Sequence, residues 1–169
     1  RSIKNEVNEV TSYGYDALRR LTSITYPASD TMAWYPTTIR YERVGSDSGV
    51  GINGTHWKQT TTTGSAEKVT HYDQRMRPVV TTESDVDLES TQRHVRRNYD
   101  YAGRERFVSY PSATASTSAG TTTTYDALGR VIGTSRTSEL GNLTTRTHYD
   151  PGFKTRFVNA RAKTTTTQF

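Results

Sequence analysis

The chain has 169 residues, a formal net charge of +5 and no cysteine. Leu, Ile, Val and Phe make up only ~16% of it, below the usual share for a packed globular core, whereas Tyr and Thr, both strand formers, make up about a quarter. No stretch approaches the roughly 18 consecutive apolar residues of a transmembrane helix. This composition excludes a helical membrane protein, a coiled coil and a Leu-rich α/β enzyme. It predicts an all-β chain with a thin core.

A Tyr-Asp pair recurs along the chain at nearly regular intervals. The clear copies are Tyr15-Asp16, Tyr72-Asp73, Tyr99-Asp100, Tyr125-Asp126 and Tyr149-Asp150. Tyr41-Glu42 is a degenerate copy within the longest interval, and Phe169 is expected to open a further copy that is cut off. Self-similarity of this kind predicts a single array of about six repeat units. The expected units span approximately 1–27, 28–57, 58–84, 85–111, 112–136 and 137–169.

The residues after each Tyr-Asp pair are those of a tight turn. A basic residue stands four positions after each Asp, at Arg20, Arg77, Arg104, Arg130 and Lys154. Gly103 and Gly129 precede two of these residues, and Asp followed by Gly at this spacing is typical of a type I turn that closes a bulged hairpin. Each unit is therefore predicted to be a β-hairpin. Arg19 and Met76 stand at the glycine position and are expected to adopt positive φ or to rebuild their turns, and Pro151-Gly152 indicates a type II turn.

Stacking such hairpins side by side predicts structural roles for the repeated side chains. Equivalent tyrosines are expected on one face as an aromatic ladder, and each Arg is expected to pair with its own or a neighbouring carboxylate. A sheet of about a dozen strands is expected to curve. The residues assigned to the repeat motif are Tyr15, Asp16, Arg20, Tyr72, Asp73, Arg77, Tyr99, Asp100, Gly103, Arg104, Tyr125, Asp126, Gly129, Arg130, Tyr149 and Asp150.

These motifs resemble the YD-repeat, or Rhs-repeat, family, whose unit reads Tyr-Asp-x-x-Gly-Arg; the segment Val158–Lys163 also resembles the return turn of that family. The resemblance implies tandem β-hairpins in a curved antiparallel sheet, part of a spiral shell like those of bacterial Rhs toxins, toxin complexes and teneurins. It also implies a structural segment that encapsulates or scaffolds a toxin or effector, in a secreted or cell-surface bacterial protein. The expected partners are the rest of the shell and its cargo, and no catalytic residue, metal ligand or cofactor is predicted.

Other motifs are weaker and have structural explanations. Gly49–Gly54 matches a dinucleotide-binding fingerprint, but a Thr-rich strand follows it, and Asn53-Gly54 indicates a hairpin turn instead. His71 and His148 each precede a Tyr-Asp pair, so we expect a repeat position and not a zinc site. Glu83, Asp85, Asp87 and Glu89 alternate, which suits a cation site on one strand, although an acidic connecting loop is the preferred interpretation.

Two alternative functions remain open. Trp34, Tyr35 and Trp57 lie outside the repeated positions, and as weak ligand candidates they suggest a cell-surface carbohydrate-binding or adhesion module. A polysaccharide-acting enzyme needs paired carboxylates about 5–10 Å apart, and the sequence places no such pair.

The charge pattern and the strand edges each lead to an expectation about binding partners. The Arg excess is expected to sit beside acidic residues at repeat positions, so no specific nucleic-acid partner is predicted. Residues 1–13 and 164–169 are expected to be open strand edges, which predicts edge-to-edge self-association.

Overall fold

A computed structural model describes residues 1–28, 34–45 and 56–169. This part of the chain is all-β, as predicted, and contains no helix. The strands are β1 (Ser2–Lys4), β2 (Val10–Tyr15), β3 (Leu21–Thr25), β4 (Thr37–Arg43), β5 (Trp57–Thr63), β6 (Ala66–Tyr72), β7 (Pro78–Asp85), β8 (Leu88–Tyr99), β9 (Glu105–Ser109), β10 (Gly120–Tyr125), β11 (Val131–Ser138), β12 (Gly141–Asp150), β13 (Lys154–Val158) and β14 (Thr164–Gln168). No helix long and apolar enough to cross a membrane occurs within these residues.

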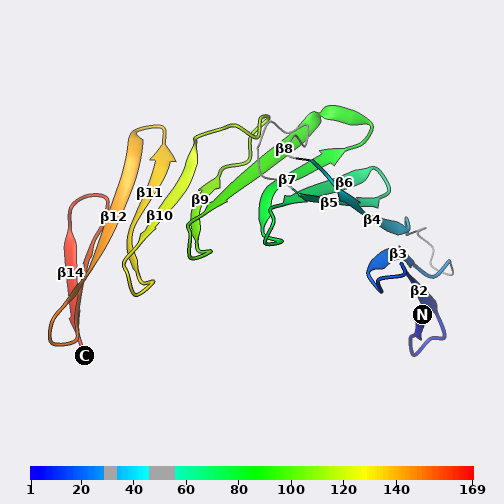
Figure 1. The fold of residues 1–169 in the computed structure, drawn as a ribbon, viewed down its shortest axis with the longest axis horizontal. Helices are drawn as coiled ribbons and strands as arrows, with labels where there is room; N and C mark the ends of the chain where they lie inside the picture. Colours follow the sequence, from blue (N-terminus) through cyan, green and yellow to red (C-terminus); the bar gives the residue numbers. More distant parts are fainter. Residues whose placement is uncertain (29–33, 46–55) are drawn as a thin grey trace. The chain divides into compact units, whose positions relative to one another are not determined.

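The strands follow one another in the sheet in chain order, without crossovers (Figure 1). Backbone contacts divide the chain into two compact units. Unit 1 comprises residues 1–94 with 113–115, and unit 2 comprises residues 95–112 with 116–169. Within each unit, the neighbouring strands whose register is defined pair antiparallel, as expected for tandem hairpins.

The apolar core is thin, as the composition predicts. Among the described residues, only Val80 and Ala115 are buried hydrophobic residues, and Val80 alone is completely buried. Cross-strand hydroxyl pairs stabilise the sheet where aliphatic contacts are few. Thr37 Oγ1 lies 2.7 Å from Thr63 Oγ1 in unit 1, and Thr134 Oγ1 lies 2.7 Å from Thr145 Oγ1 in unit 2. Such pairs suit the high Thr content because β-branched hydroxyl side chains favour strands and bond across them.

A one-residue bulge recurs at the same place in four hairpins. The register shifts just before Tyr15, Tyr72, Tyr99 and Tyr125. In each case the strand that leaves the turn carries one extra residue opposite the tyrosine strand, namely Thr22, Val79, Arg106 and Ile132. A bulge bends its strand and increases the local twist. The repeat therefore carries a bend as well as a turn.

The acidic residues at 83–89 adopt neither expected arrangement. Glu83 and Asp85 lie on β7, Asp87 lies in the turn, and Glu89 lies on β8, so these residues form the tip of a hairpin. Glu83 accepts a 2.9 Å hydrogen bond from Lys68 Nζ, and Asp85 Oδ1 accepts one from the backbone N–H of Asp87. The interpretation as a connecting loop was wrong because β-pairing continues to the end of this segment.

Candidate functional site

The repeated Asp is held inside its turn by three kinds of hydrogen bond. In the turn between β8 and β9, Asp100 N–H donates to Arg104 O at 2.9 Å, and Gly103 N–H donates to Asp100 O at 3.0 Å. Arg104 N–H donates to Asp100 Oδ1 at 2.9 Å, and Arg104 Nε donates to Asp100 Oδ2 at 2.7 Å. The same set of bonds recurs at Asp16, Asp73 and Asp126. The carboxylate is therefore clamped by its own turn and its own arginine.

These bonds lower the pKa of each repeated carboxyl group. For Asp16, the backbone N–H of Arg20 has the largest effect and lowers the pKa. For Asp73, Asp100 and Asp126, burial is the largest single influence and raises the pKa, but the hydrogen bonds and charge of the following arginine outweigh it. All four carboxyl groups are thus held in the charged form, and a depressed pKa does not suit a general acid at neutral pH.

Three of the repeated arginines, Arg20, Arg104 and Arg130, also reach the next hairpin. The Arg104 guanidinium lies 4.6 Å from the ring centroid of Tyr125, and Arg104 Nη1 donates to Asp126 O at 3.2 Å. Tyr125 Oη in turn donates to Glu105 O at 2.8 Å. Arg130 and Tyr149 repeat this arrangement, with a 4.0 Å ring contact and a 3.2 Å bond from Tyr149 Oη to Val131 O. The contact is a cation–π interaction that joins successive hairpins.

The tyrosines share a face within each unit, as the repeat pattern predicts. The register places Tyr15, Tyr41 and Tyr72 on one face of unit 1. In unit 2, it places Tyr99, Tyr125 and Tyr149 on one face. The expectation of direct ring stacking needs correction, because these tyrosines lie on alternate strands, about 9.6 Å apart at the usual strand spacing. Arg20, Arg104 and Arg130, each directly before the strand between two tyrosines, lie over the rings of Tyr41, Tyr125 and Tyr149.

The degenerate copy at Tyr41-Glu42 keeps the ladder position in a changed setting. The Arg20 guanidinium lies 4.5 Å from the Tyr41 ring centroid, as at the regular copies. Gln59 Nε2 donates to Tyr41 Oη at 3.1 Å, and Tyr72 Oη donates to Gln59 Oε1 at 2.9 Å. A glutamine amide therefore joins two tyrosines across β5 in this part of unit 1.

Positive φ occurs at the turn position where the repeat prefers glycine. Arg19 and Met76 have φ of 62° and 58°, against 85° and 84° for Gly103 and Gly129. The two substituted turns keep the same backbone hydrogen bonds as the glycine turns. The carboxylate clamp therefore sets the geometry of these two turns, and Arg19 and Met76 are held in a backbone region that is unfavourable for residues other than glycine.

The fifth clear copy departs from this clamp. Gly152 has φ of 78°, but Phe153 also adopts positive φ, at 56°. Asp150 Oδ2 lies 3.5 Å from Arg156 Nε, so Arg156 is its ion-pair partner in place of the expected Lys154.

Two turns use asparagine in the place of aspartate. Asn159 N–H bonds to Lys163 O, and Asn159 Oδ1 accepts hydrogen bonds from the N–H groups of Arg161 and Lys163. This agrees with the return turn expected over Val158–Lys163. Asn5 forms the same turn with Glu9, and sequence reasoning missed it. The sequence feature that could have predicted this turn is Asn8, three residues after Asn5, because Asn tolerates the positive φ of 68° found there.

The two histidines at the shared repeat position have different surroundings. His71 is 3% exposed, and neither ring nitrogen has a hydrogen-bond partner among the described residues, whereas His148 is exposed. Lys58 on β5 and Val80 on β7 flank His71 in the register. Burial, followed by the positive charges of Lys58 and His94, lowers the pKa of His71. His71 is therefore neutral at pH 7.

The weak ligand candidates are exposed aromatic residues of unit 1. Trp34, Tyr35 and Trp57 are 61%, 68% and 36% exposed. Trp34 lies 6.1 Å from the ring of Tyr26, centroid to centroid, whereas Trp57 pairs with Tyr72 across the strands. The fingerprint at Gly49–Gly54 lies outside the described residues.

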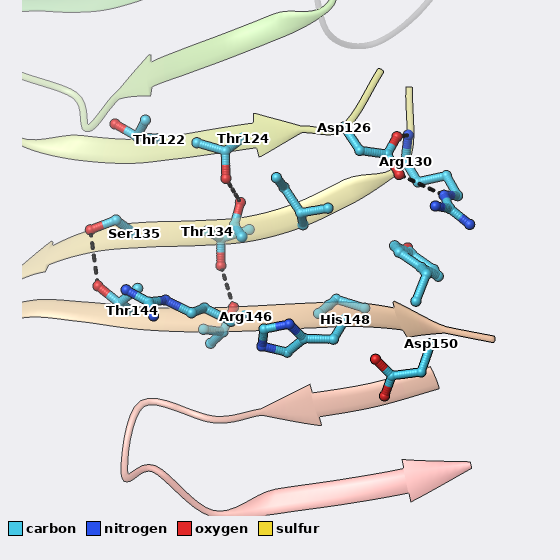
Figure 2. Close-up of a pocket in the computed structure, with 15 residues that line it drawn as sticks. Thr122, Thr124, Asp126, Arg130, Thr134, Ser135, Thr144, Arg146, His148 and Asp150 are labelled. Carbon is cyan, nitrogen blue, oxygen red and sulfur yellow. Dashed lines mark hydrogen bonds and ion pairs between the residues drawn. The ribbon is translucent and has the colours of Figure 1, made fainter. Parts of the chain in front are cut away.

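Unit 2 contains a groove over β10, β11 and β12, with a volume of about 590 Å³ (Figure 2). Hydroxyl side chains, two arginines, two aspartates and His148 line it. Gly133 forms part of the floor, where an added Cβ would lie 2.8 Å from Thr124 Oγ1. Within the described ranges, no group of three or more His, Asp or Glu side chains is arranged to hold a metal ion.

Comparison with known proteins gives one family match. The model of the family described as RHS Repeat matches residues 1–31. No curated protein matches the chain. The matched segment contains Tyr15, Asp16 and Arg20, whose clamp recurs through the later hairpins, so the match supports the resemblance that the motifs indicate.

Proposed function

We propose that this chain, whose residues 1–31 match the RHS Repeat model and whose turn clamp recurs in later hairpins, is a structural repeat module and a segment of a shell that encapsulates or scaffolds a toxin or effector, with no catalysis of its own. Its partners in this proposal are the rest of the parent shell and the enclosed cargo. RHS repeats are typical of secreted or cell-surface bacterial proteins, and we propose the same location here.

The observation that carries this proposal is the use of the repeated side chains. Asp100 is bound by its own turn and arginine, and Arg104 binds both that carboxylate and the Tyr125 ring of the next hairpin. Asp126 and Arg130 repeat the arrangement toward Tyr149. The motif thus links one hairpin to the next, which suits a continuous wall.

Limited proteolysis of the parent protein with its effector domain tests the proposal. The effector should resist a protease that digests it rapidly when it is produced alone. Arg104→Ala together with Arg130→Ala should increase its digestion, because two links between hairpins are removed. The exposed Arg106→Ala with Arg136→Ala serves as the charge-matched control and should leave protection unchanged. Rapid digestion of the effector inside the unmodified parent would falsify encapsulation.

The exposed rings of Trp34 and Tyr35 favour a second candidate, a carbohydrate-binding or adhesion module. Exposed aromatic faces offer apolar stacking surfaces. Titration with oligosaccharides while tryptophan fluorescence is followed tests it. Saturable binding that Trp34→Ala abolishes supports this function, whereas no saturable change with any sugar excludes it.

A further inference from the structure

The groove of unit 2 contains one cation that no carboxylate neutralises. Asp126 Oδ2 is 2.7 Å from Arg130 Nε, and Asp150 Oδ2 is 3.5 Å from Arg156 Nε. The Arg146 side chain is exposed and has no hydrogen bond or ion pair to any described residue. Each lining carboxylate is thus already paired, and Arg146 is left with its full charge.

Hydroxyl donors lie beside this cation. Thr144 Oγ1 donates to Ser135 Oγ at 3.5 Å, and the hydroxyl hydrogen of Ser135 has no acceptor among the described residues. Figure 2 shows Arg146, Thr144 and Ser135 along the same stretch of β11 and β12. A guanidinium and a free O–H side by side are the donors that a carboxylate prefers.

The floor of the groove leaves space for such a ligand. Gly133 pairs with Arg146 across β11 and β12 and with Thr124 across β10 and β11. A side chain at position 133 would occupy the space between Thr124 and Arg146, since its Cβ would already lie 2.8 Å from Thr124 Oγ1. The absence of a side chain at this position opens the groove in front of the guanidinium.

We propose that this groove binds a carboxylate through Arg146 and Ser135, and that the carboxylate belongs to an acidic residue of an extended peptide. Three strands span about 10 Å, which matches about three residues of extended chain. The register places Tyr149 on the face of β12 opposite Arg146, and the Arg130 guanidinium lies 4.0 Å from its ring centroid, so the Tyr149 ring offers no stacking surface for a sugar beside Arg146. The chemistry therefore favours an acidic peptide over an acidic saccharide.

Titration of the ¹⁵N-labelled chain with a blocked glycine–glutamate–glycine tripeptide tests this site by NMR. The amide signals of Ser135, Thr144 and Arg146 should shift saturably, with weak, millimolar affinity because the site is solvent-exposed. Arg146→Gln should weaken binding by about 5-fold or more, and Gly133→Ala should weaken it while keeping every charge. The unperturbed remainder of each variant's spectrum shows that the sheet is intact.

Arg136→Gln is the matched control, because Arg136 is exposed on the neighbouring strand β11 and on the face opposite Arg146. It should bind the tripeptide like the unmodified chain. The same titration is made with a blocked glycine–glutamine–glycine tripeptide, which lacks the charge, and with digalacturonate, an acidic saccharide. The proposal would be overturned if Arg136→Gln weakened binding as much as Arg146→Gln, or if the glutamine tripeptide caused equal shifts. It would also be overturned if digalacturonate bound and the glutamate tripeptide did not.

Discussion

At the scale of single residues, the turn clamp explains how non-glycine residues persist at positive φ. Met76 adopts φ of 58° while its N–H bonds to Asp73 O at 3.0 Å. An L-residue in this region has its Cβ close to the following carbonyl oxygen, which costs about 1 kcal/mol. The hydrogen bonds of Asp73 and Arg77 offset that cost.

Met76→Gly should raise the free energy of unfolding by up to about 1 kcal/mol, because the backbone strain is relieved and the Met76 side chain is 56% exposed. Urea denaturation measures this change. Gly129→Ala, at φ of 84°, is the reverse substitution and should be destabilising. A lower stability for Met76→Gly would contradict the turn assignment.

The aspartates of the clamp should make the free energy of unfolding depend on pH in the acidic range. Because the pKa of Asp100 is lower in the folded chain than in the unfolded chain, its contribution is complete above pH ~4 and is lost as pH falls through the lowered value. Asp100→Asn should reduce this dependence. The turn should survive, since Asn159 forms the same backbone bonds. Denaturation between pH 6 and 2 measures the effect, and an unchanged acid dependence in Asp100→Asn would contradict it.

At the scale of elements, hairpins are joined by arginines that act in two directions. Arg104 completes the turn of its own hairpin through Asp100 and covers Tyr125 of the next one. Tyr125 Oη returns a hydrogen bond to Glu105 O. Successive hairpins are therefore linked by side chains as well as by strand pairing.

A double-mutant cycle should reveal this link. Arg104→Ala and Tyr125→Leu should each destabilise unit 2, with a coupling of about 0.5–1 kcal/mol from the cation–π contact. The matched control is Arg106→Ala, an exposed arginine at the bulge of the same hairpin, which should cost little. Strict additivity of the two substitutions would show that the contact contributes nothing.

At the scale of the whole molecule, the described chain combines a thin core with a few buried polar groups. Val80 is completely buried, and its cross-strand neighbour His71 is 3% exposed. His71 has no hydrogen-bond partner among the described residues, and Lys58 and His94 are the cations that act on it. A second proton-sensitive element thus exists in unit 1, separate from the aspartate clamps.

His71 should destabilise unit 1 at mildly acidic pH. Since the folded chain lowers its pKa, the unfolded chain binds the proton more tightly, and stability falls as pH drops below about 6.5. His71→Leu should reduce this loss between pH 7 and 5, to which His94 also contributes because burial lowers its pKa, while leaving the aspartate-dependent loss below pH 4. Hydrogen exchange of β5, β6 and β7 locates the effect. An unchanged pH 7-to-5 profile in His71→Leu would rule out this role.

The sequence by itself determined the parts of this protein that are local. An Asp, a residue at positive φ three positions later and an Arg directly after that residue specify the same turn at Asp16, Asp100 and Asp126. The hydrogen bonds of this turn form within five consecutive residues, so the pattern is local. The high content of Tyr and Thr likewise predicted strands, and the regular recurrence of Tyr-Asp predicted that the tyrosines share one face, as they do within each unit.

Only the tertiary structure decided which side chains meet across neighbouring strands. Arg104 meets Tyr125 because one strand separates successive tyrosines, a distance that depends on the sheet and not on the motif. The burial of His71 and the open floor at Gly133 depend on which residues the register sets beside them. Register arises from pairing between distant residues and from bulges, so no local pattern could specify it.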